Sequence, residues 1–575
     1  MAASVTALRV DPAASAAAAK VRQALDRDGR LLRGGVILLI LWYAVTLVLP
    51  LWALLSKALQ DKNGAWIGLG NFVTYFATPA LSQSVVNSLW VSALSTVICV
   101  GLAFAYAYGL TRTCMLGRGL FKTIAQIPIL APSLLPAIAL VYLFGNQGLI
   151  TPVLMGNPIY GPIGIIMGSV FWTFPHALLI ITTALSVADA RLYEAAQALR
   201  ASPSRIFWTV TLPGARYGLI SATFVVFTLI ITDFGVPKVI GGQFNMLATD
   251  IYKQVIGQQN FQMGAVVGLV LLVPAVIAFA VDRVVQRRQS ALLSARAVPL
   301  VPRPNRRIDR AFLVICAPIA AVIVLVIGTA FFASLAKFWP YNLTPSLKNY
   351  DFDNMDGGGW ASYWNSLQMA TMVAVFGTAL IFTGAYLLEK TPRFRQPRAI
   401  AQFLALLPLA VPGLVLGLGY IFFFNNPSNP LNFLYGTMAI MVVCTIAHFY
   451  SVAHLTATTA LKQIDPEFET VGASLRVPVW RTFLKVTLPV CLPAVLDIAI
   501  YLFVNAMTTV SAVVFLYAPK TTLAAIAVLN MDDAGDIAPA AAMAMTIFFT
   551  SALVRVAYLG LTAGLLGRAQ AWRRR

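Results

Sequence analysis

Residues that could carry metal or nucleophilic chemistry are few and scattered along this chain. The histidines are His176, His448 and His454, and the last two stand six positions apart, which places them on different faces of a helix. The five cysteines form no CxxC pair and look like packing residues. No GxxxxGK[ST] motif occurs, so the chain is not expected to cradle ATP phosphates itself. We expect no catalytic residue, no metal site and no cofactor in this chain.

A second group of candidates consists of polar residues inside apolar segments, where such groups are costly and usually face the interior of a helical bundle. The members are Asp233, Asp497, Asn505, Thr508, Thr509 and Ser511. Two interpretations stay open for them. They line the path of a polar substrate, or they cap helices and form hydrogen bonds between helices.

The most informative candidate is a polar segment that occurs twice. The first repeated segment, residues 188–213, reads ADARLYEAAQALRASPSRIFWTVTLP, and the second repeated segment, residues 464–489, reads IDPEFETVGASLRVPVWRTFLKVTLP. Aligned without gaps, residues 182–213 and 458–489 share 13 identities in 32 positions. Composition alone would give about 2. The segment is therefore an ancient duplication.

Each copy has the features of a short helix pair that docks on a partner. In the first copy Asp189 can cap a short helix, the alanines that follow permit close approach to another surface, and Arg200 and Arg205 present charge. A second short helix ends at Leu212-Pro213, where the chain turns back into the membrane. Such a compact pair suits a groove on another protein.

The rest of the chain is apolar enough to place these candidates in a membrane protein. Hydrophobic residues make up 59% of the 575 positions, charged residues 11%, and the mean hydropathy is +0.79. Twelve apolar runs are predicted to span a bilayer. They lie near 35–58, 85–110, 123–145, 161–186, 216–240, 263–284, 312–336, 364–388, 400–424, 434–461, 491–516 and 538–566.

The net charge of +20 follows the positive-inside rule rather than pointing to nucleic acid. Basic residues crowd the stretches 20–33, 112–122, 283–310, 390–398 and 573–575, whereas acids gather in the alternate loops at 351–356 and 532–536. We therefore expect a multi-pass protein of the bacterial inner membrane with both termini in the cytoplasm.

The repeat divides the chain into two parallel six-helix halves, because six spans return the chain to the same side. The predicted parts are a cytosolic tail (1–33), a first half (34–284), a basic cytosolic linker (285–311) and a second half with a short basic tail (312–575). Prolines at 128, 132 and 136 and at 408 and 412 predict kinks in the third span of each half.

The repeated segment resembles the EAA motif of binding-protein-dependent permeases, the membrane subunits of ATP-binding-cassette importers. Glu194, Ala195 and Ala196 match its opening triad and Leu212-Pro213 its close, and the resemblance covers roughly residues 83–284 and 361–562. Arg200 and Arg476 stand where the family has glycine, which disfavours a tight turn. In the second copy Thr470-Val471-Gly472 replaces the triad.

The resemblance implies an all-α permease of the type I importer fold. Its partners would be a cytosolic ATPase dimer, which binds ATP and Mg, and a periplasmic solute-binding protein, in addition to membrane lipid. It also implies contact with the ATPase for a set of residues in the two segments. They are Glu194, Ala195, Ala196, Arg200, Arg205, Glu469, Gly472, Arg476 and Arg481.

The substrate is less well defined by the sequence. The stretch VNAMTTVSAVVFLY, residues 504–517, resembles permeases for 2-aminoethylphosphonate, which is the preferred expectation, and fused permeases for ferric iron are similar in layout. An ion-coupled secondary transporter is the rival from another class. The scarcity of carboxylates in the spans disfavours it. A membrane-embedded enzyme ranks last, because no cluster of His, Cys or carboxylates is apparent.

Overall fold

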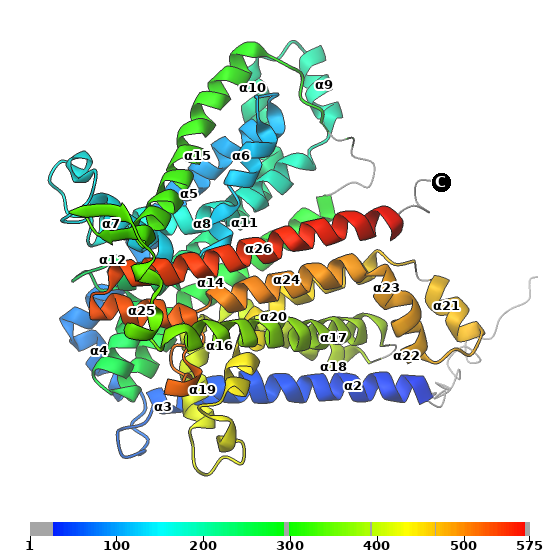
Figure 1. Cartoon of the computed structure of the whole chain (residues 1–575). Helices are drawn as coiled ribbons and strands as arrows, with labels where there is room; N and C mark the ends of the chain where they lie inside the picture. Colours follow the sequence, from blue (N-terminus) through cyan, green and yellow to red (C-terminus); the bar gives the residue numbers. More distant parts are fainter. Residues whose placement is uncertain (1–26, 293–297, 299, 392–393, 466, 570–575) are drawn as a thin grey trace, which may run out of the picture.

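The structure is a computed structural model that describes residues 27–292, 298, 300–391, 394–465 and 467–569. Within these residues the regular structure is helical apart from one antiparallel ribbon between β1 (Ala336–Phe338) and β2 (Asn342–Pro345). Helices satisfy their own backbone groups, which is the requirement for a chain in a bilayer. The expected all-α fold is confirmed (Figure 1).

The helices that make up the spans of the first half lie largely within its apolar runs. In chain order they are α2 (Arg27–Tyr43), α3 (Leu49–Ala58), α5 (Pro79–Arg112), α6 (Arg118–Ile124), α7 (Leu134–Phe144), α8 (Pro162–Ser186), α11 (Leu212–Ile231) and α14 (Phe261–Leu292). Short helices connect them. These are α4 (Gly70–Ala77), α9 (Ala190–Ala198), α10 (Pro203–Ile206), α12 (Gly235–Ile240) and α13 (Leu247–Tyr252).

The second half repeats this order. Its helices are α15 (Arg306–Leu335), α16 (Gly359–Met372), α17 (Thr378–Lys390), α18 (Arg395–Leu406), α19 (Gly413–Phe424), α20 (Met438–Lys462), α21 (Glu467–Ser474), α22 (Val479–Thr482), α23 (Leu488–Val490), α24 (Leu492–Thr508), α25 (Ala524–Ala534) and α26 (Ile537–Ala569). Nine continuous helical stretches of the described chain are long and apolar enough to span a membrane, and three bent pairs bring the total up to twelve. Six fall in each half, as predicted.

The predicted kinks lie at matched places and are sharp. The third span of the first half bends by 104° between Leu130 and Leu134, and its counterpart bends by 113° between Ala410 and Gly413. Pro128 and Pro408 lie in the short 3-10 turns that precede the two breaks. Pro136 differs from the prediction, since it lies inside the first turn of α7, where a proline is tolerated.

The fifth predicted run of each half is not one helix. In the first half α11 ends at Ile231, and α12 begins only at Gly235, so the run 216–240 is interrupted. In the second half α24 ends at Thr508 and is followed by turns, and its entry bends by 77° near Cys491. The interruptions fall at polar and glycine residues, which offer the backbone alternative hydrogen bonds.

The first span of each half packs on the opposite half. α2 lies against α17 and α18, and α3 lies against α19, whereas α15 lies against α5 and α7 (Figure 1). Glycines allow these close approaches. A Cβ on Gly419 would stand 2.8 Å from the carbonyl oxygen of Pro50, and one on Gly109 would stand 3.0 Å from Cys316 Sγ. Small residues are what permit such backbone contact between helices in a membrane.

Valine at Gly419 should therefore weaken the contact between the halves. The added side chain collides with backbone rather than with a movable side chain, so we expect a loss of about 1–3 kcal/mol in stability. The apparent Tm of the detergent-purified protein measures it. Gly328→Val in α15 is the matched control, because a Cβ at Gly328 meets nothing within 4 Å. Equal Tm values for the two variants would contradict this packing.

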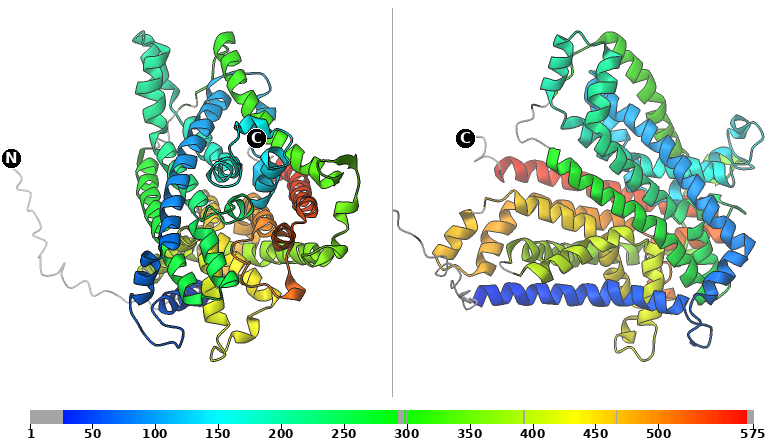
Figure 2. Two further views of the ribbon diagram at one scale, coloured as in Figure 1. Left: turned by 90° about the vertical axis from the view of Figure 1, so that its left-hand side faces the viewer. Right: turned by 180° about the vertical axis from the view of Figure 1, so that it is seen from behind.

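The two bundles form a V. In Figure 1 the bundle with α5, α8, α11 and α15 slants upward, and the bundle with α2, α16, α17, α24 and α26 lies horizontally. They meet at the end that carries α7, α12 and α25, here called the far end. They diverge toward the end that carries α9 and α10 in one bundle and α21 and α22 in the other, here called the segment end. Figure 2 shows the same divergence from behind.

The helices extend beyond the predicted domain limits. α14 continues to Leu292 and α15 starts at Arg306, so both ends of the stretch 285–311 are helical. α2 starts at Arg27, inside the predicted tail 1–33, and residues 1–26 lie outside the described part of the chain. The division into a tail, two halves and a linker stays a prediction.

Candidate coupling segments and translocation path

The first repeated segment forms two short helices that lead into the fifth span. The Asp189 carboxylate accepts a hydrogen bond from the Arg191 amide at 3.1 Å, which caps α9 as expected. Tyr193 is buried, donates to Thr211 Oγ1 at 3.1 Å and lies under the Arg112 guanidinium. One face of α9 is thus fixed to the bundle. Glu194 and Ala195, the next two residues, are exposed.

The sequence-predicted contact residues of the first segment lie on this outer side. Glu194, Ala195, Arg200 and Arg205 are exposed, and Ala196 is half-buried. The Ser202 hydroxyl accepts from the Arg205 amide at 3.3 Å and caps α10. The structure therefore brings these residues to one exposed helix pair.

The second repeated segment also forms two short helices, but a different contact fixes it to the bundle. Gly472 lies close to α22, since a Cβ there would stand 3.2 Å from Thr482 Oγ1. Arg476 and Arg481 are exposed. Glu469 belongs to α21, but its side chain lies outside the described part of the structure. The Val479 amide, at the start of α22, donates to the Asp28 carboxylate of α2 at 3.0 Å, so the first helix of the chain holds the second segment.

A tight turn ends the first helix of both segments, although the sequence disfavoured it. Arg200 and Arg476 adopt φ values of 54° and 55°, in the left-handed region. The Ala201 amide donates to the Ala196 carbonyl at 3.0 Å, and the Val477 amide donates to the Gly472 carbonyl at 2.9 Å. This is the six-to-one bond of a Schellman end, which usually uses glycine. The expectation of a lost turn is wrong, because the surrounding structure holds arginine in the glycine conformation.

Apolar side chains are exposed on both segments. Leu192, Leu199 and Trp208 are exposed in the first segment. In the second, Phe468, Val471 and Leu475 line a groove of about 610 Å³ together with charged residues such as Arg481 and Lys485. Clustered apolar exposure of this kind is typical of surfaces that contact another protein or a membrane.

The linker contacts the first segment as well. The Ala190 amide donates to the Val298 carbonyl at 2.9 Å. Further along, Asp309 accepts from the Cys114 amide at 2.8 Å, in the loop after α5. The chain between the halves is therefore tied to the segment end of the first half.

The polar candidates of the spans are not gathered in one place. Asp233 accepts from the Gly235 and Val236 amides at 3.2 and 3.1 Å and caps α12. Asn505 and Thr508 donate to carbonyls one turn earlier in α24. Asp233 thus caps a helix, whereas Asn505 and Thr508 make bonds within their own helix.

The remaining candidates lie at two levels. Asp497 is exposed and accepts a hydrogen bond from Tyr558 of α26. It is 11 positions before Thr508, about 16 Å along a helix. Thr509 is buried, and Ser511 lies beside Gly413 at the break of the third span, where an added Cβ would stand 2.5 Å from Ser511 Oγ. In the first half Gly235 lies equally close to Ser133. The breaks of the third and fifth spans thus meet within each half.

A pair of matched hydrogen bonds escaped the sequence analysis. The Ser221 hydroxyl donates to the Asp282 carboxylate at 2.6 Å, between α11 and α14. The aligned repeats, residues 182–213 and 458–489, are offset by 276 positions, and this offset relates Ser221 to Asp497 and Asp282 to Tyr558. Each half therefore joins its fifth and sixth spans by a hydrogen bond. The carboxylate is on the sixth span in the first half and on the fifth span in the second half. Applying the offset to Asp497 leads to Ser221 and not to Asp282, so the offset alone does not reveal the exchanged pair.

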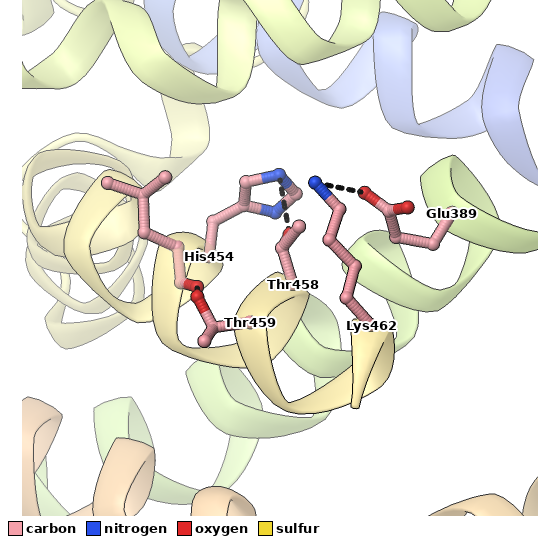
Figure 3. Close-up of polar contacts among 6 residues, drawn as sticks. Glu389, His454, Thr458, Thr459 and Lys462 are labelled. Atoms are coloured by element: carbon pink, nitrogen blue, oxygen red, sulfur yellow. Dashed lines mark hydrogen bonds and ion pairs between the residues drawn. The ribbon is translucent and has the colours of Figure 1, made fainter. Parts of the chain in front are cut away.

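The three histidines lie in the spans, on α8 and α20. His454 Nε2 is 3.4 Å from Thr458 Oγ1, one turn later in α20 (Figure 3). Its ring also stacks on Tyr450. Nearby, Lys462 pairs with Glu389 at 3.7 Å and joins the ends of α20 and α17. Among the described residues, no group of three His, Cys, Asp or Glu is placed to hold a metal ion.

Two fused bundles of membrane-spanning helices, each with an exposed helix pair between its fourth and fifth spans, define a membrane transport permease. Residues 98–291 and 380–565 both match the family described as binding-protein-dependent transport system inner membrane component, and the chain belongs to this family. The family resemblance seen in the sequence is confirmed.

Several relatives are similar over most of the chain. A provisionally assigned ferric transport system permease protein of Haemophilus influenzae is 27% identical over 76% of this chain and 70% of its own length. The ferric transport system permease protein of Actinobacillus pleuropneumoniae is 26% identical over 80% and 70%. A second Haemophilus influenzae protein, an Fe(3+)-transport system permease, is 22% identical over 90% and 96%.

A solved structure, a bacterial alginate ABC transporter in complex with an alginate-bound periplasmic protein, also matches. It is 18% identical over 45% of this chain and 95% of its own, with a TM-score of 0.39. This likeness is too distant to place individual residues.

Family membership defines the role of the chain. It is a multi-pass inner-membrane permease of an importer that takes its substrate from a binding protein. It is a transport subunit and not an enzyme, and ATP hydrolysis belongs to a separate subunit.

Proposed function

We propose that this chain is the permease of an ATP-driven ferric iron importer. The observation that carries the proposal is its similarity, over about three quarters of its length, to permeases named for ferric transport. A third such permease matches over 90% of the chain. The expectation of 2-aminoethylphosphonate finds no support among these relatives, and ferric iron therefore replaces it as the first candidate.

The two repeated segments are the proposed contacts with the ATPase. Their apolar side chains are exposed at the segment end, and their outer faces carry Arg200, Arg205, Arg476 and Arg481. ATP and Mg²⁺ would bind to the partner dimer. Closure of that dimer would draw the two segments together and rock the bundles about their middle, which separates them at the far end and opens that end to the substrate.

This mechanism fixes an orientation. The segment end and both termini would face the cytoplasm, in agreement with the basic residues of the tail, the linker and the C-terminus. The far end would face the periplasm and receive the binding protein.

The proposed substrate path runs between the halves. A trivalent iron ion prefers oxygen ligands. Oxygen-bearing candidates come from both halves, and Thr509 and Ser511 lie next to a helix break, where backbone carbonyls can add to the side chains. Asp233 and Asp497 have local hydrogen bonds, so we expect any role of theirs in the path to need a change of partner.

Reconstituted transport tests the proposal. The permease is purified with its cognate ATPase and binding protein and placed in proteoliposomes. We expect vanadate-sensitive accumulation of radioactive ferric iron that requires the binding protein, ATP and Mg²⁺. Accumulation of 2-aminoethylphosphonate instead of iron would overturn the assignment of ferric iron as the substrate. Uptake that persists without the ATPase and collapses with an ionophore would favour the ion-coupled rival.

A further inference from the structure

An ion pair joins the two halves at the far end. Lys238 Nζ of α12, in the first half, lies 2.8 Å from Asp533 Oδ1 of α25, in the second half. The side chains are 22% and 42% exposed, so water reaches the pair. The two helices lie where the bundles meet, opposite the repeated segments (Figure 1).

Aromatic rings and a second carboxylate surround this pair. Lys238 Nζ stands 5.2 Å from the ring centroid of Tyr252, and that ring stacks on Phe515 of the second half. Burial, with the adjacent charge of Asp533, raises the pKa of Asp532 to about 7. Burial and the charge of Asp532 raise the pKa of Tyr160 in the first half. The acidic pair of α25 thus faces the first half, where Lys238 supplies a cation.

The pair has no counterpart across the repeat. The offset of 276 carries Lys238 to Val514 and Asp533 to Gly257, neither of which can form an ion pair. The hydrogen bonds at Asp282 and Asp497, by contrast, recur in both halves. The ion pair instead joins one half to the other at the end where they meet, so it bears on how the halves move relative to each other.

We propose that Lys238 and Asp533 form a latch that holds the far end closed while the segment ends are apart. This inference rests on the proposed rocking of the halves. For the substrate to enter, the halves must separate at the far end and the ion pair must break. A partly exposed pair is weak enough to break and reform in each cycle, and its loss shifts the equilibrium toward the open far end.

The test uses the complete transporter in proteoliposomes, without binding protein. We expect Lys238→Glu and Asp533→Lys each to raise the basal ATPase rate about two- to fivefold, since the far end opens without the signal from the binding protein. The exchanged double variant, Lys238→Glu with Asp533→Lys, should return the rate toward the wild-type value. Lys253→Glu is the control, because that ammonium bonds Asn245 of its own half.

A disulfide measures the same latch directly. Cysteines at positions 238 and 533 should cross-link under oxidation, block uptake and release it on reduction. Unchanged basal rates in both single variants, a double variant that is no better than either, or normal uptake by the cross-linked protein would each overturn the latch. Iron uptake by the wild-type complex tests the proposed function independently of the variants. The latch can therefore be disproved while the proposed function holds, and the two outcomes are distinguishable.

Discussion

ATP-driven uptake should fall about a hundredfold when Leu199 and Leu475 are both replaced by aspartate. The two leucines hold equivalent positions at the ends of α9 and α21 and are 83% and 70% exposed. An apolar anchor in a protein interface contributes about 2 kcal/mol or more, and about 1.4 kcal/mol is a factor of ten in affinity. Two buried carboxylates would therefore uncouple the ATPase from the permease.

The control for this pair is Leu116→Asp. Leu116 is 83% exposed and follows α5 at the segment end but lies outside both repeated segments. We expect it to leave uptake and copurification of the ATPase unchanged, whereas the double variant inserts in the membrane and loses the ATPase. If the double variant copurifies with a normal amount of ATPase, the segments are not the docking surface.

Valine at both Arg200 and Arg476 should lower uptake at least tenfold, whereas glycine at both should preserve it. An L-residue in the left-handed conformation costs about 1–2 kcal/mol, glycine removes that cost, and a β-branched side chain increases it. We expect the glycine variant to be slightly more stable than the wild type, and the valine variant to distort both helix ends. Uptake in proteoliposomes and apparent Tm are the measurements.

Glutamate at both positions separates charge from conformation. It keeps an ordinary side chain in the turn and reverses the charge that faces the partner. If the glutamate variant loses uptake and the glycine variant keeps it, the loss is due to repulsion between the introduced negative charges and the partner. The conformation of the turn would then not be its cause. A glycine variant as inactive as the valine variant would show that the arginine side chains themselves, and not the turn, are required.

Much of the candidate site could be predicted because it depends on local chemistry. Apolar length gives the spans, and the charge of the loops gives an expected orientation. The aspartate at position 189 caps the helix that follows it, and the prolines at 128 and 408 precede the expected breaks. Each of these features acts within a few residues of its own position, so the order of residues suffices to find it.

The repeat could also be predicted from the sequence, since residues 182–213 and 458–489 share 13 identities in 32 positions. The equivalent contacts that the repeat produces in the fold could not. The hydrogen bond between Asp282 and Ser221 has a counterpart in which carboxylate and hydroxyl exchange helices, and identity alone does not detect an exchange. The left-handed conformation of the two arginines was missed for a related reason. Conformational preference describes a single residue, whereas the packing of the whole segment holds these arginines in the turn.

The sequence by itself determined a twelve-span membrane protein with two parallel halves and a pair of exposed helical segments. Only the tertiary structure decided that α2 and α15 cross to the opposite half, that Asp28 caps α22, and that Lys238 reaches Asp533. Hydropathy and helix signals act along the chain. Contacts between helices depend instead on which helix faces meet in three dimensions. Nothing in the sequence near Gly419 or Pro50 indicates that these two residues pack together.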